Sequence, residues 1–180
     1  MKKYWVLILI AGIAIIAVSA FEFMKRPGKG DAAPTFVLSS LNGENVSLGD
    51  FRGKPVLIHF WATWCGTCQE DFPNFVKFYE QYKSKGLVIL SVSEDGNRAD
   101  TVVKSFINTM KTDLPVLLDK DGSVANSYYS FGVPEDVLID KNGIIVSRSE
   151  GPINWTSPKF LNKINSLIGN AVLPAKAGIQ

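Results

Sequence analysis

Two cysteines, Cys65 and Cys68, are the only thiols in the sequence, and two residues separate them. They follow a continuous apolar run, residues 55–61, which predicts a buried strand, and they precede residues 69–85, whose aromatic spacing predicts a helix. A Cys-x-x-Cys at a strand-to-helix turn is typical of a redox site. The N-terminus of a helix favours a thiolate, and the second sulfur can attack a mixed disulfide formed by the first.

A zinc site and a structural disulfide are the alternatives for such a pair. Structural zinc takes four ligands, whereas the sequence has no further cysteine and one histidine, His59, which we expect to be buried beneath the turn. A disulfide that closes so short a loop constrains the unfolded chain very little. Thiol–disulfide exchange is therefore the favoured interpretation, with no metal and no cofactor.

The charged residues argue against a nucleic-acid-binding protein. The formal net charge is +2, but residues 1–30 hold five Lys or Arg and one acidic residue, which leaves 14 basic and 16 acidic side chains in the remainder. No basic face and no Gly-rich phosphate loop is evident. The length of 180 residues suffices for one domain with a hydrophobic core and an N-terminal extension.

The N-terminal extension predicts export. Lys2 and Lys3 precede an uncharged apolar segment, residues 4–21, whose length is the lower limit for a membrane-spanning helix. The alternative is a signal peptide cleaved after Val18-Ser19-Ala20, but the apolar run is long for one, so a retained anchor is favoured. Either would carry the domain across the membrane, where paired cysteines persist. Residues 1–30 are thus predicted to be an anchor or signal peptide followed by a linker.

The remaining sequence predicts one α/β domain over residues 31–169, followed by a loose tail over residues 170–180. Asn42-Gly43 is a strong hairpin signal between two short strands. The order of elements fits a central mixed sheet with helices on both faces. Further strands are predicted at residues 87–92, 116–118, 137–139 and 144–147, and further helices at residues 102–110, at residues 124–129 and from Ser157-Pro158 to Gly169.

Four segments carry a resemblance to a known family across roughly residues 32–151. The segments are Ala33-Pro34-Thr35-Phe36 with Leu48-Gly49-Asp50-Phe51-Arg52-Gly53-Lys54-Pro55, Phe60-Trp61-Ala62-Thr63-Trp64-Cys65-Gly66-Thr67-Cys68, Ser91-Val92-Ser93-Glu94-Asp95, and Gly132-Val133-Pro134-Glu135 followed by Leu138-Ile139-Asp140 and Asn142-Gly143. On these segments the chain resembles the thioredoxin fold and, within it, the membrane-tethered reductases of cytochrome c maturation of the TlpA, ResA and CcmG (DsbE) type. The first segment is also shared with peroxiredoxins.

The resemblance implies roles for individual residues. Cys65 would be the exposed attacking thiol and Cys68 the buried resolving thiol. Pro134 matches the cis-proline that packs against the disulfide, and its lack of an N–H leaves the backbone of Val133 free to pair with an incoming extended peptide. Glu94 matches an acid near the cysteines, where burial would raise its pKa and let it take the proton from Cys68. A solvated loop acid is the alternative for Glu94.

Four further residues, Glu135, Trp64, His59 and Thr67, have two interpretations or depart from the family pattern. Glu135 follows the proline as in the CcmG (DsbE) branch, with an exposed turn acid as the alternative. Trp64 would cover the edge of the site or pack in the core, and Trp61 is assigned to the core. His59 stands where the family commonly has Asn, and is either a neutral buried histidine or an aid to proton transfer. Thr67 replaces the proline of ordinary thioredoxin and would change the reduction potential.

The resemblance implies an anchored, extracytoplasmic oxidoreductase that reduces disulfides in proteins. Apocytochrome c is the candidate substrate, a membrane-bound thiol protein would donate electrons, and a monomer is expected. A peroxide reductase is one alternative, but Thr63 lies one residue too near Cys65 for that mechanism. A copper-delivery protein is the other, but such carriers use wider cysteine spacing and a downstream histidine, and none follows His59.

Overall fold

The computed structural model describes Tyr4, residues 12–13 and residues 26–169. The predicted anchor or signal peptide and the predicted tail lie almost entirely outside these residues. Within them, no helix combines the length and apolar character needed to cross a membrane. The elements are β1 (Val37–Ser40), β2 (Asn45–Ser47), η1 (Leu48–Phe51), β3 (Val56–Trp61), α2 (Gly66–Tyr82), β4 (Val88–Ser93), η2 (Gly96–Arg98), α3 (Ala99–Met110), β5 (Val116–Leu118), α4 (Ser123–Tyr128), β6 (Glu135–Ile139), β7 (Ile145–Glu150) and α5 (Pro158–Leu167).

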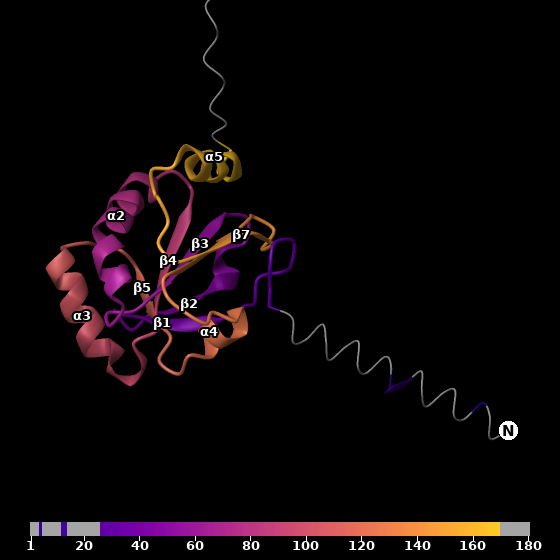
Figure 1. The fold of residues 1–180 in the computed structure, drawn as a ribbon, viewed down its shortest axis with the longest axis horizontal. Helices are drawn as coiled ribbons and strands as arrows, with labels where there is room; N and C mark the ends of the chain where they lie inside the picture. Colours follow the sequence, from indigo (N-terminus) through magenta and orange to yellow (C-terminus); the bar gives the residue numbers. More distant parts are fainter. Residues whose placement is uncertain (1–3, 5–11, 14–25, 170–180) are drawn as a thin grey trace, which may run out of the picture.

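The strands form one mixed sheet in the order β2-β1-β5-β4-β3-β6-β7. Strands β3, β4 and β5 run parallel, and the other pairings are antiparallel. The hairpin of β1 and β2 extends the sheet at one edge, and the hairpin of β6 and β7 completes the other (Figure 1). The thioredoxin fold with an N-terminal hairpin, as predicted from the sequence, is confirmed.

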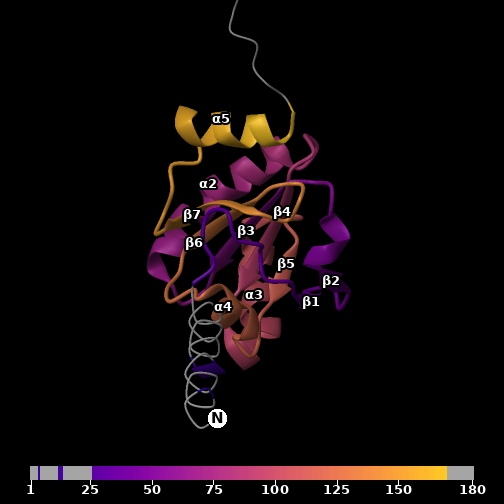
Figure 2. The same cartoon turned by 90° about the vertical axis from the view of Figure 1, so that its right-hand side faces the viewer.

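Helices cover both faces of the sheet, because side chains of successive strand residues point to opposite faces. Leu57 and Trp61 of β3 belong to the hydrophobic cluster that includes residues of α2, α3 and α5. Ile58 and Phe60 belong to the second cluster, with residues of α4 and β1. Figure 1 shows α2 and α3 together on one side, with α4 on the other, and Figure 2 shows α5 lying across the end of α2.

The central strand β3 leads directly to the cysteines. All six of its residues are buried, as the continuous apolar run predicts for a strand covered on both faces. In the parallel pairing of β3 with β4, Trp61 lies opposite Ser93, so both strands end at the same level in the sheet. The cysteine turn and the residues after β4 therefore lie together at the carboxyl ends of these two strands.

The helix after the cysteines begins earlier than the aromatic spacing predicts. It starts at Gly66 because Cys65 takes the N-cap position, and it ends at Tyr82, a few residues before Gly86, whose φ is +94°. Cys68 therefore lies in the first turn of α2. At α5, Pro158 occupies the first turn as predicted, but Ser157 makes no side-chain capping bond.

The linker ahead of β1 pairs with the start of β7. Gly30 donates its backbone N–H to the carbonyl oxygen of Ile145 at 2.8 Å, and Ile145 donates to Asp31 at 2.9 Å. Ala33 donates to Gly143 at 2.9 Å. Residues 30–33 therefore run along the outer side of the chain at the start of β7, at the edge of the sheet.

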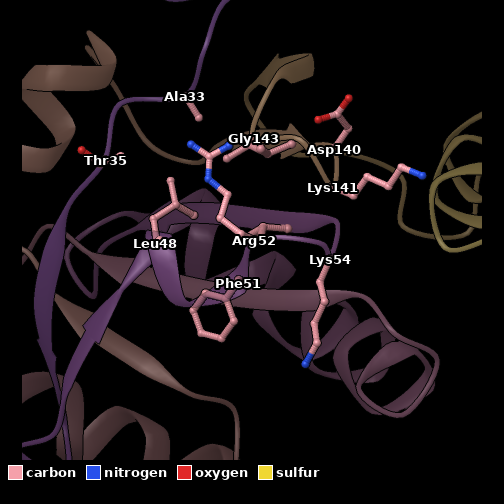
Figure 3. A pocket seen from close by; sticks show the side chains of 12 residues that line it. Ala33, Thr35, Leu48, Phe51, Arg52, Lys54, Asp140, Lys141 and Gly143 are labelled. Atoms are coloured by element: carbon pink, nitrogen blue, oxygen red, sulfur yellow. The ribbon is translucent and has the colours of Figure 1, made fainter.

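A small hollow lies at the end of the sheet opposite the cysteines (Figure 3), where Val56 begins β3. The side chain of Arg52 enters this hollow, and its Nη1 donates to the carbonyl oxygen of Asn142. Gly143 has a φ of +81°, and a Cβ there would collide with the Arg52 guanidinium. Because an internal side chain fills the hollow, we assign it a structural role.

Candidate redox site

The two cysteines form a disulfide at the N-terminus of α2. Cys65 is the N-cap residue, and the backbone N–H of Cys68 donates to Cys65 Sγ at 3.1 Å. An N–H directed at this sulfur, together with the positive end of the helix dipole, stabilises a thiolate there once the bond is reduced. Cys65 is 7% exposed and Cys68 is 2% exposed. The predicted exposed cysteine is thus nearly covered in the disulfide form, although Cys65 remains the more exposed of the two residues.

The turn before Cys65 is held by a carboxylate that the sequence did not single out. Asp95 accepts the backbone N–H of Thr63 at 3.0 and 3.1 Å and its hydroxyl at 2.5 Å. Ser93 also donates to Asp95, at 2.8 Å. From α2, the Gln69 side chain donates to the Thr63 carbonyl oxygen at 2.5 Å. These bonds fix the turn between the end of β4 and the first turn of the helix.

The peptide bond between Val133 and Pro134 is cis, the geometry that the resemblance implies. The carbonyl oxygen of Val133 lies 3.5 Å from Cys65 Sγ, which places the cis-proline loop directly beside the disulfide. The loop is held on its other side by Gly151, whose N–H donates to the Pro134 carbonyl oxygen at 2.8 Å. The fold thus brings together two segments separated by more than sixty residues.

Glu94 follows β4 at the edge where the cysteine turn lies. Its backbone N–H donates to the carbonyl oxygen of Trp61 at 2.9 Å, and its side chain accepts from the Ser130 hydroxyl at 3.5 Å. Burial raises the pKa of Glu94 to about 7, and the negative charge of Asp119 adds to this shift, while the bond from Ser130 opposes it. A carboxyl group that titrates near neutral pH can both accept and donate a proton there.

Comparison with known proteins agrees with this geometry. The model of the AhpC/TSA family matches residues 29–148. The chain belongs to the AhpC/TSA family. Within it, the chain is similar to the thiol-disulfide oxidoreductase ResA of Bacillus thuringiensis, with 36% identity over 68% of this chain and 69% of that protein. It is also similar to ResA of Bacillus subtilis, with 32% identity over 81% of this chain and 86% of the relative.

A solved structure of a related protein supports the same assignment. A crystal structure provisionally named thiol:disulfide interchange protein DsbE, from Chlorobium tepidum, has 31% identity and a TM-score of 0.70, and the match covers 79% of this chain and 99% of that chain. This chain is thus similar to the ResA proteins in sequence and to the Chlorobium tepidum protein in both sequence and fold. This AhpC/TSA-family protein is therefore a thioredoxin-like thiol–disulfide oxidoreductase.

In this AhpC/TSA-family protein Glu135 is not the exposed turn acid that was one alternative. It begins β6 directly after Pro134 and is completely buried. Its Oε1 accepts from Arg148 Nε at 2.9 Å and from Arg26 Nη2 at 2.7 Å. A buried carboxylate requires such partners, because removing a charge from water is costly. Arg26 is 109 residues from Glu135, and Arg148 reaches Glu135 only through the pairing of β6 with β7, so no local pattern could have revealed these contacts.

His59 lies in the core between the sheet and α2, as expected from the sequence. Its Nδ1 lies 2.9 Å from Asp136 Oδ1, and its ring packs 4.1 Å from the ring of Phe75. His59 and Asp136 are directly opposite in the antiparallel pairing of β3 and β6. The pair thus joins the strand that leads to the cysteines with the strand that follows the cis-proline. Asp136 was missed because only the strand register reveals it.

The two tryptophans of the cysteine segment lie in different environments. Trp61 is fully buried, and its ring packs 4.5 Å from Phe72, which confirms its assignment to the core. Trp64 is 66% exposed, so it does not pack in the core. An exposed aromatic side chain directly before Cys65 offers an apolar surface at the site.

Proposed function

We propose that this oxidoreductase reduces disulfide bonds in protein substrates outside the cytoplasm. The observation that carries the proposal is the position of Cys65 Sγ, at the N-cap of α2 and 3.5 Å from the carbonyl oxygen of Val133, beside the cis Pro134. The reactive sulfur of Cys65 thus lies beside the backbone of Val133, which can pair with an extended peptide. This arrangement suits a substrate that is itself a polypeptide.

The reaction proceeds through a mixed disulfide. In the reduced protein, the Cys65 thiolate attacks one sulfur of the substrate disulfide, and the other substrate sulfur leaves as a thiolate that takes up a proton. Cys68, once deprotonated, attacks Cys65 Sγ and releases the second substrate sulfur. Two electrons and two protons pass from the cysteine pair to the substrate. A membrane-bound dithiol protein then reduces the Cys65–Cys68 disulfide by the same exchange in reverse.

Glu94 serves as the proton acceptor for Cys68 in this scheme. Its pKa of about 7 means that it is partly ionised at neutral pH and can accept a proton there. Its backbone bond to Trp61 holds it at the edge of the sheet from which the cysteine turn emerges. Pro134 contributes by leaving the Val133 backbone open to the substrate.

For the biological setting we propose cytochrome c maturation, with apocytochrome c as the substrate. Support comes from the resemblance to the CcmG (DsbE) branch, including Glu135 after the cis-proline. Residues 4–21 would anchor the protein in the cytoplasmic membrane with its redox domain on the outer, periplasmic face. That the protein acts as a monomer stays a prediction.

A Cys68→Ala variant provides the test. Without the resolving thiol, Cys65 should remain joined to its partner, so the full-length variant expressed in cells should carry a reducible adduct that mass spectrometry identifies. The double variant Cys65→Ala, Cys68→Ala is the matched control and should carry none. An adduct with apocytochrome c supports the full proposal, and adducts with other exported proteins would redirect the substrate. If Cys68→Ala forms no mixed disulfide with any protein, the proposed function is wrong.

A further inference from the structure

A pocket of about 330 Å³ adjoins the cis-proline loop. Its wall is formed by residues 131–135, by Glu150 and Gly151 at the end of β7, and by Arg26 from the linker. Phe131 is 84% exposed, although it is a large apolar side chain. Val133 both lines this pocket and approaches Cys65, so the pocket lies next to the redox site.

A buried carboxylate at this pocket has one oxygen without a partner. The Glu135 side chain is 1% exposed, and its Oε1 accepts all the bonds from the two arginines. Its Oε2 is buried, and no described residue donates to it. An unsatisfied buried carboxylate oxygen costs free energy that a further donor would recover. The pocket therefore has an acceptor with unused capacity.

The two arginines at Glu135 are held differently. Arg148 is 11% exposed, comes from β7 and also donates its Nη1 to two backbone carbonyl oxygens at 2.7 and 2.8 Å. Arg26 is 34% exposed and comes from the linker, and its guanidinium bridges Glu135 to the exposed Glu150. The Nε of Arg26 has no partner among the described residues. Arg148 is thus anchored within the sheet and by backbone carbonyl oxygens. Within the part of the chain that the structure describes, Arg26 is held only by two side chains, so its guanidinium can move out of the pocket without loss of any bond between strands.

We propose that this pocket is a subsite for a basic side chain of the protein substrate, and that Arg26 occupies it when no substrate is bound. The inference rests on the proposed function, because it requires a polypeptide joined to Cys65. When Arg26 leaves, Glu135 keeps the guanidinium of Arg148, and Glu150 loses the guanidinium that bridges it to Glu135. The exposed ring of Phe131 offers an apolar surface for the stem of an incoming lysine or arginine and an aromatic face for its charge.

The geometry sets where the basic residue must lie in the substrate. Val133 is beside the sulfur that the substrate cysteine would join, and Glu135 is two residues further along the chain. An extended chain advances about 3.3 Å per residue. A lysine or arginine about two positions from the substrate cysteine would therefore reach the two carboxylates.

The test uses the reduced full-length protein in detergent and three disulfide-linked peptide dimers. The peptides share one sequence with a single cysteine and carry Lys, Gln or Glu two positions from that cysteine on both sides. We expect the second-order rate constant for reduction to be about fivefold higher for the Lys peptide than for the Gln peptide, since the cation gains charge-assisted bonds. The Glu peptide should be slowest, and added salt should reduce the differences.

Single-charge variants separate a subsite from a structural role. Arg26→Gln removes the internal occupant, so the ratio of the Lys rate to the Gln rate should rise, whereas a merely structural Arg26 would lower both rates together. Glu150→Gln should lower the ratio. Lys163→Gln and Glu44→Gln, which change exposed charges on α5 and on the β1–β2 turn, should leave the ratio at its wild-type value.

The outcomes distinguish the two proposals. Equal rates for all three peptides, or a ratio unchanged by Arg26→Gln, would show that the subsite is wrong while disulfide reduction stands. A preference for the Glu peptide would also overturn the subsite. If the reduced protein reduces none of the peptides, then the proposed function fails, and the subsite fails with it.

Discussion

Replacing Glu94 with Gln should change how stability depends on pH. Burial, together with the charge of Asp119, raises the pKa of this carboxyl group from its ordinary value of 4.5 to about 7 in the folded protein. Between these two pH values the folded protein keeps a proton that the unfolded chain has released. The free energy of unfolding therefore falls as the pH rises through this window, and the loss is complete above about pH 7.

The size of the effect follows from the same two values. A tenfold change in proton affinity corresponds to about 1.4 kcal/mol, so the full shift corresponds to about 3 kcal/mol. Glu94 is only half-buried, and water screens part of its charge, which reduces the expected effect to about 2 kcal/mol. Because Gln is uncharged at every pH, Glu94→Gln should equal the wild type at pH 4 and exceed it in stability by about 2 kcal/mol at pH 8.

Urea unfolding of the oxidised full-length protein in detergent, followed by tryptophan fluorescence, measures this difference. Glu44→Gln is the matched control, because Glu44 is exposed on the hairpin turn and its replacement should give a difference that does not vary with pH. A Glu94→Gln difference that is the same at pH 4 and pH 8 would refute the reasoning. If Glu94 accepts the proton of Cys68, the rate of thiol–disulfide exchange in the wild type should change near pH 7, and this change should be absent from Glu94→Gln.

Three further substitutions test the contacts around the site. Burial raises the pKa of Asp136, and His59 opposes that shift, so His59→Asn should lower the free energy of unfolding by about 3 kcal/mol, with a larger loss at pH 8 than at pH 5 in urea titrations. If the pH profiles of thiol–disulfide exchange in the variant and the wild type superimpose, His59 has no role in proton transfer. Asp95→Ala frees the backbone of Thr63 and should slow mixed-disulfide formation in stopped-flow assays at least severalfold, with unchanged rates counting against a positioning role. Tyr128→Phe deletes the bond to the Pro34 carbonyl oxygen and should cost about 1 kcal/mol in urea unfolding without altering exchange.

Local patterns in the sequence were sufficient for most of the fold. The apolar run of β3 and the amphipathic spacing of α2 each reflect burial of a single element, so they are readable without knowledge of the neighbours. The Asn-Gly signal likewise predicted the β1–β2 hairpin. The boundary errors have a local cause too, since aromatic spacing does not reveal that Cys65 itself caps the helix.

The polar contacts of the site were not predictable in the same way. Glu135 pairs with Arg26, which lies 109 residues away, and His59 pairs with Asp136 only because β3 and β6 adopt one particular register. Asp95 is one residue from the predicted Glu94, yet its role depends on the turn at Thr63 that folds back over the end of β4. Such pairings depend on the tertiary structure. From its residue type alone, each of these side chains could equally well be exposed to solvent.

Residues 30–33 cover the start of an edge strand to which a second molecule could otherwise add. An uncovered edge strand presents free N–H and C=O groups, to which a strand of another molecule can add and so begin aggregation. Here the bonds from Gly30 and Ala33, together with the bond from Ile145 to Asp31, occupy the outer side of the chain at the start of β7. A shortened chain that began after Ala33 would keep every strand of the sheet and both cysteines, but it would leave this edge open to a second copy.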